Sequence, residues 1–241
     1  MSSVRRRVWG GLLLVALVAS GPAAAAETRV AFLTSDGVAI AGTYYEPSRR
    51  PAPMVLLLHM PTRNRADWTS VGRRFADVGV GTLAIDLRGH GESGAGAESE
   101  PAAALESSLR DVEAALAWLS RRPEAIPGRV GLVGASAGAN LAVLAAAADP
   151  SVHAVVLLSV TLDFRGLRTA AGFQKLGTRP ALLIASREDS YAARSARELS
   201  SKVPTLHEFW LLEEAGHGSV IMTRRPDLVS SMVDWLSARL L

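Results

Sequence analysis

The stretch from Arg129 to Leu144 reads RVGLVGASAGANLAVL and carries a serine between two glycines. Its apolar first part predicts a short strand, and the small residues after Gly138 predict a helix. A chain that reverses from strand to helix within a few residues brings backbone segments close together. Positions 134 and 138 then require glycine, which has no Cβ. Ser136 is therefore expected on a tight turn, a nucleophile elbow, with its hydroxyl at the end of a sheet.

Outward from this turn, apolar runs of strand length alternate with segments of helical periodicity. A hairpin is expected at 28–45, strands at 54–59, 80–86, 129–134, 152–160, 180–185 and 206–212, and helices at 67–78, 105–122, 137–148, 192–202 and 227–240. This alternation predicts one α/β domain with a mostly parallel sheet and helices on both faces. Residues 94–104 are expected to form a loop, and the segment 161–179 is too short for a large lid.

The N-terminus has the layout of a secretory signal peptide. Three arginines at 5–7 precede an apolar run at 8–19, a Ser-Gly-Pro break and four alanines. This pattern predicts a cleaved leader at 1–26, a catalytic domain at 27–241, and a secreted or periplasmic protein. An uncleaved membrane anchor is the alternative, although the apolar run is shorter than the ~20 residues of a spanning helix.

Composition excludes several classes of function. The chain of 241 residues has no cysteine, so disulfides, thiolate nucleophiles, cysteine metal sites and cysteine-linked lipid anchors are all excluded. It carries 26 Lys and Arg, of which three lie in the predicted leader, against 23 Asp and Glu. The rest of the chain is thus formally neutral, and no basic patch favours nucleic acid or a membrane surface. Histidine spacing gives no metal motif, so no metal site is expected.

A serine hydroxyl needs a base to become a nucleophile, and the base needs an orienting acid. His217 lies in the loop Glu-Ala-Gly-His-Gly after an apolar strand, where the alternative is a simple surface turn. Asp189 follows another strand and is the expected acid, with Glu188 and Asp163 as competitors. Asp189 is also placed to cap the helix that begins near Ala192.

The other four histidines are expected to have other roles. His59 ends a buried strand and is expected to brace the loop that follows it by hydrogen bonding. His90 precedes Ser136 in the chain and would give a different order of catalytic groups. His153 is expected at the edge of its strand, and His207 is expected to be structural.

Attack of a hydroxyl on a carbonyl places negative charge on oxygen, which backbone N–H groups must meet. The N–H of Ala137, at the start of the helix after the nucleophile, is one expected donor. The second is expected from the loop after His59. Because Pro61 has no N–H, Met60 is the predicted donor.

These motifs together resemble the α/β-hydrolase family. The order His59-Met60, then residues 86–93 (DLRGHGES), the Gly134–Gly138 turn, Asp189 and His217 is similar to small bacterial serine hydrolases of the dienelactone-hydrolase-like or carboxylesterase type. The resemblance implies an eight-stranded, mostly parallel sheet and a Ser136–His217–Asp189 triad.

Two features depart from many members of the family. This chain has Met60-Pro61 where many relatives carry glycine after the histidine. Dienelactone hydrolases proper use a cysteine nucleophile, so the serine at 136 excludes carrying over that reaction. It also argues against dehalogenase and epoxide hydrolase chemistry, which begins from an aspartate in this fold.

The resulting expectation is a cofactor-free serine hydrolase that cleaves carboxylic esters through an acyl-enzyme. Without a long insertion, the site is expected to be open and shallow, suited to short-chain esters or to an accessible acyl group on a larger molecule. A thioesterase, peptidase or acyltransferase would use the same three residues, and a non-catalytic binding protein could retain the fold. The sequence leaves the substrate and the oligomeric state open.

Overall fold

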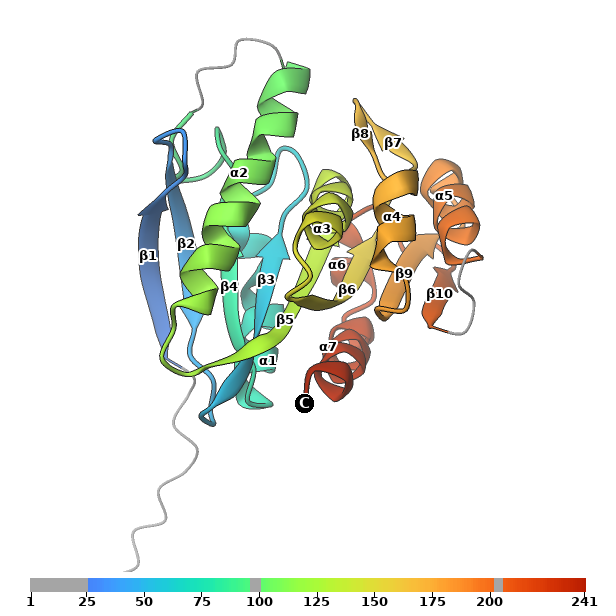
Figure 1. Ribbon diagram of the computed structural model, residues 1–241. Helices are drawn as coiled ribbons and strands as arrows, with labels where there is room; N and C mark the ends of the chain where they lie inside the picture. Colours follow the sequence, from blue (N-terminus) through green and yellow to red (C-terminus); the bar gives the residue numbers. More distant parts are fainter. Residues whose placement is uncertain (1–25, 96–100, 202–205) are drawn as a thin grey trace, which may run out of the picture.

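The computed structural model describes residues 26–95, 101–201 and 206–241, so the predicted leader lies outside it except for Ala26. The described chain forms an eight-stranded sheet in the order β1-β2-β4-β3-β5-β6-β9-β10 (Figure 1). Only the pairs β1–β2 and β2–β4 are antiparallel. The predicted single α/β domain with an eight-stranded, mostly parallel sheet is confirmed. The strands are β1 (Glu27–Leu33), β2 (Ala39–Tyr45), β3 (Ala52–Leu58), β4 (Gly81–Ile85), β5 (Ala125–Ala135), β6 (Val152–Leu158), β9 (Ala181–Ser186) and β10 (His207–Leu212).

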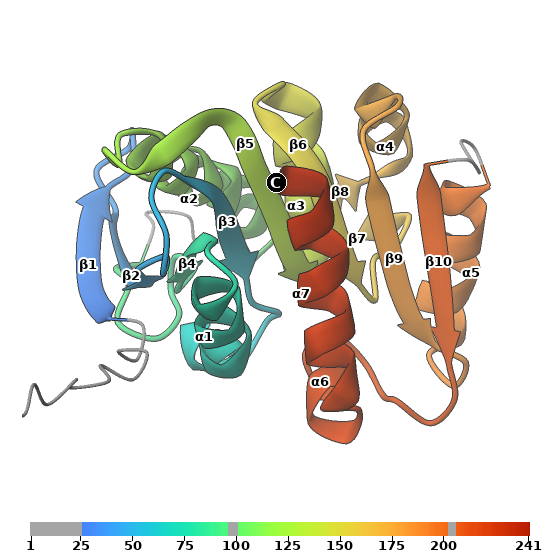
Figure 2. The same cartoon turned by 90° about the horizontal axis from the view of Figure 1, so that it is seen from below.

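Helices cover both faces of this sheet, as Figures 1 and 2 show from two directions. One face carries α2 (Pro101–Ser120), α3 (Ala137–Ala148), α4 (Ala170–Leu176) and α5 (Ser190–Ser200). The other face carries α1 (Thr69–Asp77), α6 (Val220–Arg224) and α7 (Asp227–Leu240), with a 3-10 turn, η1 (Arg65–Trp68), before α1. No helix in the described ranges has the length and apolarity needed to cross a membrane.

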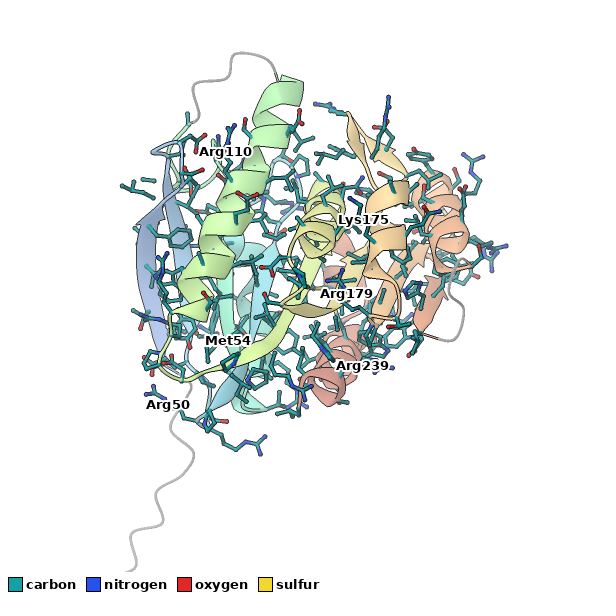
Figure 3. All side chains as sticks on the ribbon, in the orientation of Figure 1. Arg50, Met54, Arg110, Lys175, Arg179 and Arg239 are labelled. Carbon is teal, nitrogen blue, oxygen red and sulfur yellow. The ribbon has the colours of Figure 1, made fainter. Side chains whose placement is uncertain are left out.

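The central strand β3 shows how the sheet supports two cores. All seven of its residues are buried, as expected for a parallel strand covered on both sides. Met54, Leu56 and Leu58 belong to the core beneath α2 and α3. Val55 and Leu57 belong to the core beneath α1 and α7. Charged residues such as Arg110 and Lys175 lie on the outer faces of α2 and α4 (Figure 3).

One expectation about a loop was wrong, and a segment for which no element was predicted contains three short ones. Helix α2 begins at Pro101, inside the segment 94–104 that was expected to be a loop. The segment 161–179 forms a small hairpin, β7 (Asp163–Phe164) and β8 (Leu167–Arg168), followed by α4. The side-chain amide of Asn140 in α3 donates to the carbonyl oxygens of Thr161 and Leu167, at 3.1 and 2.9 Å. A contact between segments far apart in the sequence thus supports this hairpin. The local residue pattern therefore does not predict the hairpin.

The segment 86–93 is a structural brace. The buried Asp86 carboxylate accepts the backbone N–H groups of Arg65 and Glu92, at 2.7 and 2.8 Å. Arg88 pairs with Asp111 at 2.8 Å and also with Asp36. Its hydrogen bonds hold the pKa of the Asp36 carboxyl far below the usual range. These contacts tie the loop after β4 to the β1–β2 turn and to α2.

The predicted bracing role of His59 is confirmed. Its Nε2 accepts the backbone N–H of Leu87 at 2.9 Å, and its Nδ1 lies 2.8 Å from the carbonyl oxygen of Met60. Because a carbonyl oxygen only accepts, Nδ1 carries the hydrogen and the ring is neutral. Burial lowers the pKa of His59, which favours this neutral form. His59 therefore joins the loop after β3 to the loop after β4.

His207, the first residue of β10, is expected to make the free energy of unfolding depend on pH. The ring is buried and meets Phe173 of α4 edge-on, with 4.7 Å between centroids. Burial lowers its pKa below the ordinary value of 6.5. As the pH falls through that value, the unfolded chain binds a proton that the folded chain does not, so the free energy of unfolding decreases.

Urea unfolding of the wild type at pH 7.5 and at pH 5.5 measures this loss, and His207→Leu is expected to make it smaller. The part due to His59, whose pKa is also lowered, remains. His153→Leu is the matched control, because that ring is partly exposed. An unchanged pH dependence in His207→Leu would contradict the assignment.

Candidate active site

Ser136 lies on the turn between β5 and α3, where the backbone is strained. Its φ and ψ are 54° and −120°, a region that residues with a Cβ seldom adopt. A Cβ on Gly134 would lie 2.6 Å from the backbone nitrogen of Ala139. A Cβ on Gly138 would lie 2.6 Å from the carbonyl oxygen of His59. Both glycines are thus required by close backbone approach, as the sequence predicted.

The structure brings Ser136, His217 and Asp189 into one hydrogen-bonded chain. His217 Nε2 lies 2.8 Å from Ser136 Oγ, although the two residues are 81 positions apart. His217 Nδ1 lies 2.6 Å from Asp189 Oδ2. Since a carboxylate only accepts, Nδ1 carries the hydrogen, and Nε2 is left to accept the hydroxyl proton of Ser136. The three side chains come from the ends of β5, β9 and β10, which share one edge of the sheet.

Asp189 performs both roles that the sequence suggested for it. Oδ2 faces His217, and Oδ1 accepts the backbone N–H of Ala192 at 3.4 Å as the N-cap of α5. Burial alone would raise the pKa of Asp189, but its hydrogen bond to His217 and the other donors around it lower the pKa below its ordinary value. The carboxylate is therefore charged at neutral pH and can stabilise an imidazolium.

The two competing acids lie elsewhere in the hydrogen-bond network. Glu188 accepts the backbone N–H of Gly216 at 2.8 Å and the hydroxyl of Ser186, so it supports the loop that carries His217. Asp163 accepts the backbone N–H of Gly166 at 2.8 Å within the β7–β8 hairpin. Each carboxylate thus has a local structural partner, and Asp189 is the acid in contact with the imidazole.

The nucleophile is buried while its base is open to solvent. Ser136 is 2% exposed, whereas the His217 side chain is 45% exposed.

The two predicted oxyanion donors come from α3 and from the loop after β3. Ala137 is the first residue of α3, so its N–H belongs to the open end of the helix. Met60 lies two residues after β3, and the carbonyl oxygens of Leu58 and His59 lie close to Gly138. A Cβ built on Gly218 would lie 2.5 Å from Met60 Sδ and 3.6 Å from Ser136 Cβ. The Met60 side chain therefore lies against the His217 loop beside the nucleophile.

Sequence reasoning missed two serines that support the site. The Ser159 hydroxyl, directly after β6, accepts the backbone N–H of Gly218 at 2.9 Å. The Ser186 hydroxyl, at the end of β9, accepts the backbone N–H of Ala215 at 2.8 Å. Each is a polar residue that closes an apolar strand at the catalytic edge, and this position was the available signal. Across 26–95, 101–201 and 206–241, no cluster of three His, Asp or Glu residues could hold a metal ion.

Residues 36–217 match the family of X-Pro dipeptidyl-peptidases, family S15. The chain belongs to this family. The matched range contains Ser136 and Asp189 and ends at His217. Membership identifies an α/β-hydrolase enzyme of the serine hydrolase type. The narrower dienelactone-hydrolase-like type stays a prediction.

Solved structures with similar folds include further α/β-hydrolases. An esterase of Pyrococcus furiosus is 20% identical, with a TM-score of 0.74 over 90% of this chain and 92% of that one. The α/β-hydrolase GrgF from Penicillium is 15% identical, with a TM-score of 0.73 over 89% and 99%. A putative α/β-hydrolase from Agrobacterium tumefaciens is 20% identical, with a TM-score of 0.69 over 88% and 96%. At these identities the likeness establishes the fold.

Among curated proteins, the polyketide transferase ATR5 of Stachybotrys chlorohalonatus is 29% identical over 137 residues. The match covers 56% of this chain and 45% of that protein, so this chain spans less than half of its relative.

Proposed function

We propose that the protein is a serine esterase that cleaves carboxylic esters through an acyl-enzyme on Ser136. The observation that carries the proposal is the chain of hydrogen bonds from Asp189 through His217 to the strained Ser136. This arrangement supplies a nucleophile, a base and an orienting acid, with the base accessible to solvent.

In the proposed reaction His217 Nε2 takes the Ser136 proton as Oγ attacks the ester carbonyl. The N–H groups of Ala137 and Met60 hold the resulting oxyanion, and Asp189 stabilises the imidazolium. The imidazolium then gives its proton to the departing alcohol, which leaves Ser136 acylated. A water molecule, deprotonated by His217, attacks the acyl-enzyme and releases the acid. The reaction needs no cofactor.

Two features favour esters with a small or accessible acyl group. His217 is close to half exposed, and the segment 161–179 contributes a short hairpin and a short helix in place of a large lid. The solved esterase of similar fold is consistent with this substrate class.

Membership of the S15 family favours a second candidate, cleavage of an amide bond after proline. The partial match to a polyketide transferase favours acyl transfer as a third.

Turnover of p-nitrophenyl esters of increasing chain length tests the proposal against these rivals. We expect the highest kcat/KM with short acyl chains and much slower cleavage of thioesters and of X-Pro p-nitroanilides. Faster cleavage of X-Pro anilides than of esters would assign a peptidase. Preferential transfer to an added alcohol would assign an acyltransferase. If a fluorophosphonate probe left Ser136 unlabelled, the protein would be a binding module.

We also propose that residues 1–26 are removed and that the enzyme acts outside the cytoplasm, as a secreted or periplasmic protein. N-terminal sequencing of the protein from its native source is expected to begin near Glu27. A sequence that begins at Met1 would indicate an anchored form instead.

A further inference from the structure

Ser159 lies between the strands that carry the nucleophile and the acid. It follows β6, which pairs with β5 on one side and β9 on the other. The backbone N–H of Ser136 donates to the carbonyl oxygen of Leu158 at 2.8 Å, and that of Ser159 donates to Ile184 at 2.8 Å. Ser159 itself is fully buried. Its hydroxyl is thus enclosed at the centre of the catalytic edge.

This hydroxyl binds the loop that carries the base. It accepts the backbone N–H of Gly218, the residue after His217, at 2.9 Å. The Ser159 hydroxyl is also one of the groups that lower the pKa of Asp189. One side chain therefore anchors the loop of the base to the end of β6, next to β9, the strand that leads to the acid.

The backbone at Ser159 is strained in the way that functional positions often are. Its φ is 52°, in the left-handed region where a residue with a Cβ is disfavoured. Ser136 has a similar φ of 54°. Strain of this kind persists only where surrounding contacts determine the conformation. At Ser159 the left-handed conformation accompanies a hydroxyl that reaches the backbone of Gly218.

We propose that Ser159 is a positioning residue for the reaction, which orients the His217 loop through its hydroxyl. This inference rests on the proposed function of Ser136. Loss of the hydroxyl leaves the buried Gly218 N–H without its acceptor.

Two substitutions at this position separate the hydroxyl from the backbone strain. Ser159→Ala and Ser159→Gly both remove the hydroxyl, but glycine adopts a φ of 52° without steric cost. We expect both variants to lose about 10- to 100-fold in kcat with little change in KM. Glycine is expected to recover thermal stability relative to alanine without recovering kcat.

The pH profile gives a readout that a purely structural role would not move. Loss of the Ser159 hydroxyl removes one of the groups that lower the pKa of Asp189, so the acid limb of kcat/KM moves to higher pH in both variants. Ser219→Ala is the matched control. That hydroxyl anchors the next residue of the same loop to Asp67, away from Asp189. The control is expected to keep the wild-type midpoint.

Fluorophosphonate labelling of Ser136 separates failure of this inference from failure of the proposed function, because it needs no substrate. Slow labelling of both Ser159 variants, beside fast labelling of the wild type, supports the positioning role. Wild-type labelling rates, kcat and pH midpoint in both variants would overturn it. An unlabelled wild type would instead overturn the proposed function.

Discussion

Ser136→Ala is expected to reduce ester turnover by on the order of 10⁴-fold or more and to abolish fluorophosphonate labelling. The substitution removes the hydroxyl oxygen that lies 2.8 Å from His217 Nε2, and it leaves the imidazole and Asp189 in place. Residual turnover would come from water in the retained oxyanion site. The fold should be unaffected, because alanine keeps the Cβ that the strained turn already accommodates.

Ser195→Ala is the matched control for this experiment. Ser195 is buried in α5, and its hydroxyl has no hydrogen-bond partner among the described residues. Its removal is expected to leave turnover unchanged and stability equal or higher. Steady-state kinetics and thermal unfolding of both variants are the measurements. Retained activity in Ser136→Ala would reject the assignment of the nucleophile.

Gly138→Ala is expected to cause the largest loss of stability, by more than about 3 kcal/mol, and to prevent accumulation of folded protein. The new Cβ would meet the carbonyl groups of Leu58 and His59, and the latter oxygen would be 2.6 Å away. These are backbone atoms of the last residue of the central strand β3 and of the residue after it, so they cannot move aside as a side chain can. Soluble yield and urea unfolding measure the effect.

Gly172→Ala provides the comparison within another helix. A Cβ at Gly172 of α4 would have its closest contact, at 3.3 Å, with a methyl group of Leu144, which is a movable side-chain atom. In a helix, alanine is more favourable than glycine by about 1 kcal/mol. This variant should therefore fold, with a stability close to that of the wild type or higher. If Gly138→Ala and Gly172→Ala were equally stable, contact of a Cβ at position 138 with the backbone of Leu58 and His59 would not determine the stability.

Much of the site could be predicted because α/β folds place the ends of their parallel strands at one edge. Ser136, Asp189 and His217 each follow an apolar run, so their positions along the chain implied their proximity. The choice between Glu188 and Asp189 was open to local reasoning, since both lie in the same loop. The structure separates them: Glu188 faces Gly216, whereas Asp189 faces His217.

The remaining features depend on contacts between distant residues. The β7–β8 hairpin is supported by Asn140 from α3. The last four residues of the predicted loop, 101–104, belong to α2, which begins at Pro101. Ser159 carries no local signal beyond its place after a strand, and its role becomes visible only when Gly218 lies beside it.

The amino-acid pattern by itself determined the layered architecture, the turn at Ser136 and the candidates Ser136 and His217. Periodicity and the need for glycine in tight turns involve residues close together in the sequence, so the sequence alone predicts them. Only the tertiary structure decided which acid meets the imidazole and which buried hydroxyls anchor the His217 loop. These features depend on the geometry of hydrogen bonds between neighbouring strands and loops. That geometry is set by the orientation of side chains that the fold brings together from distant parts of the chain.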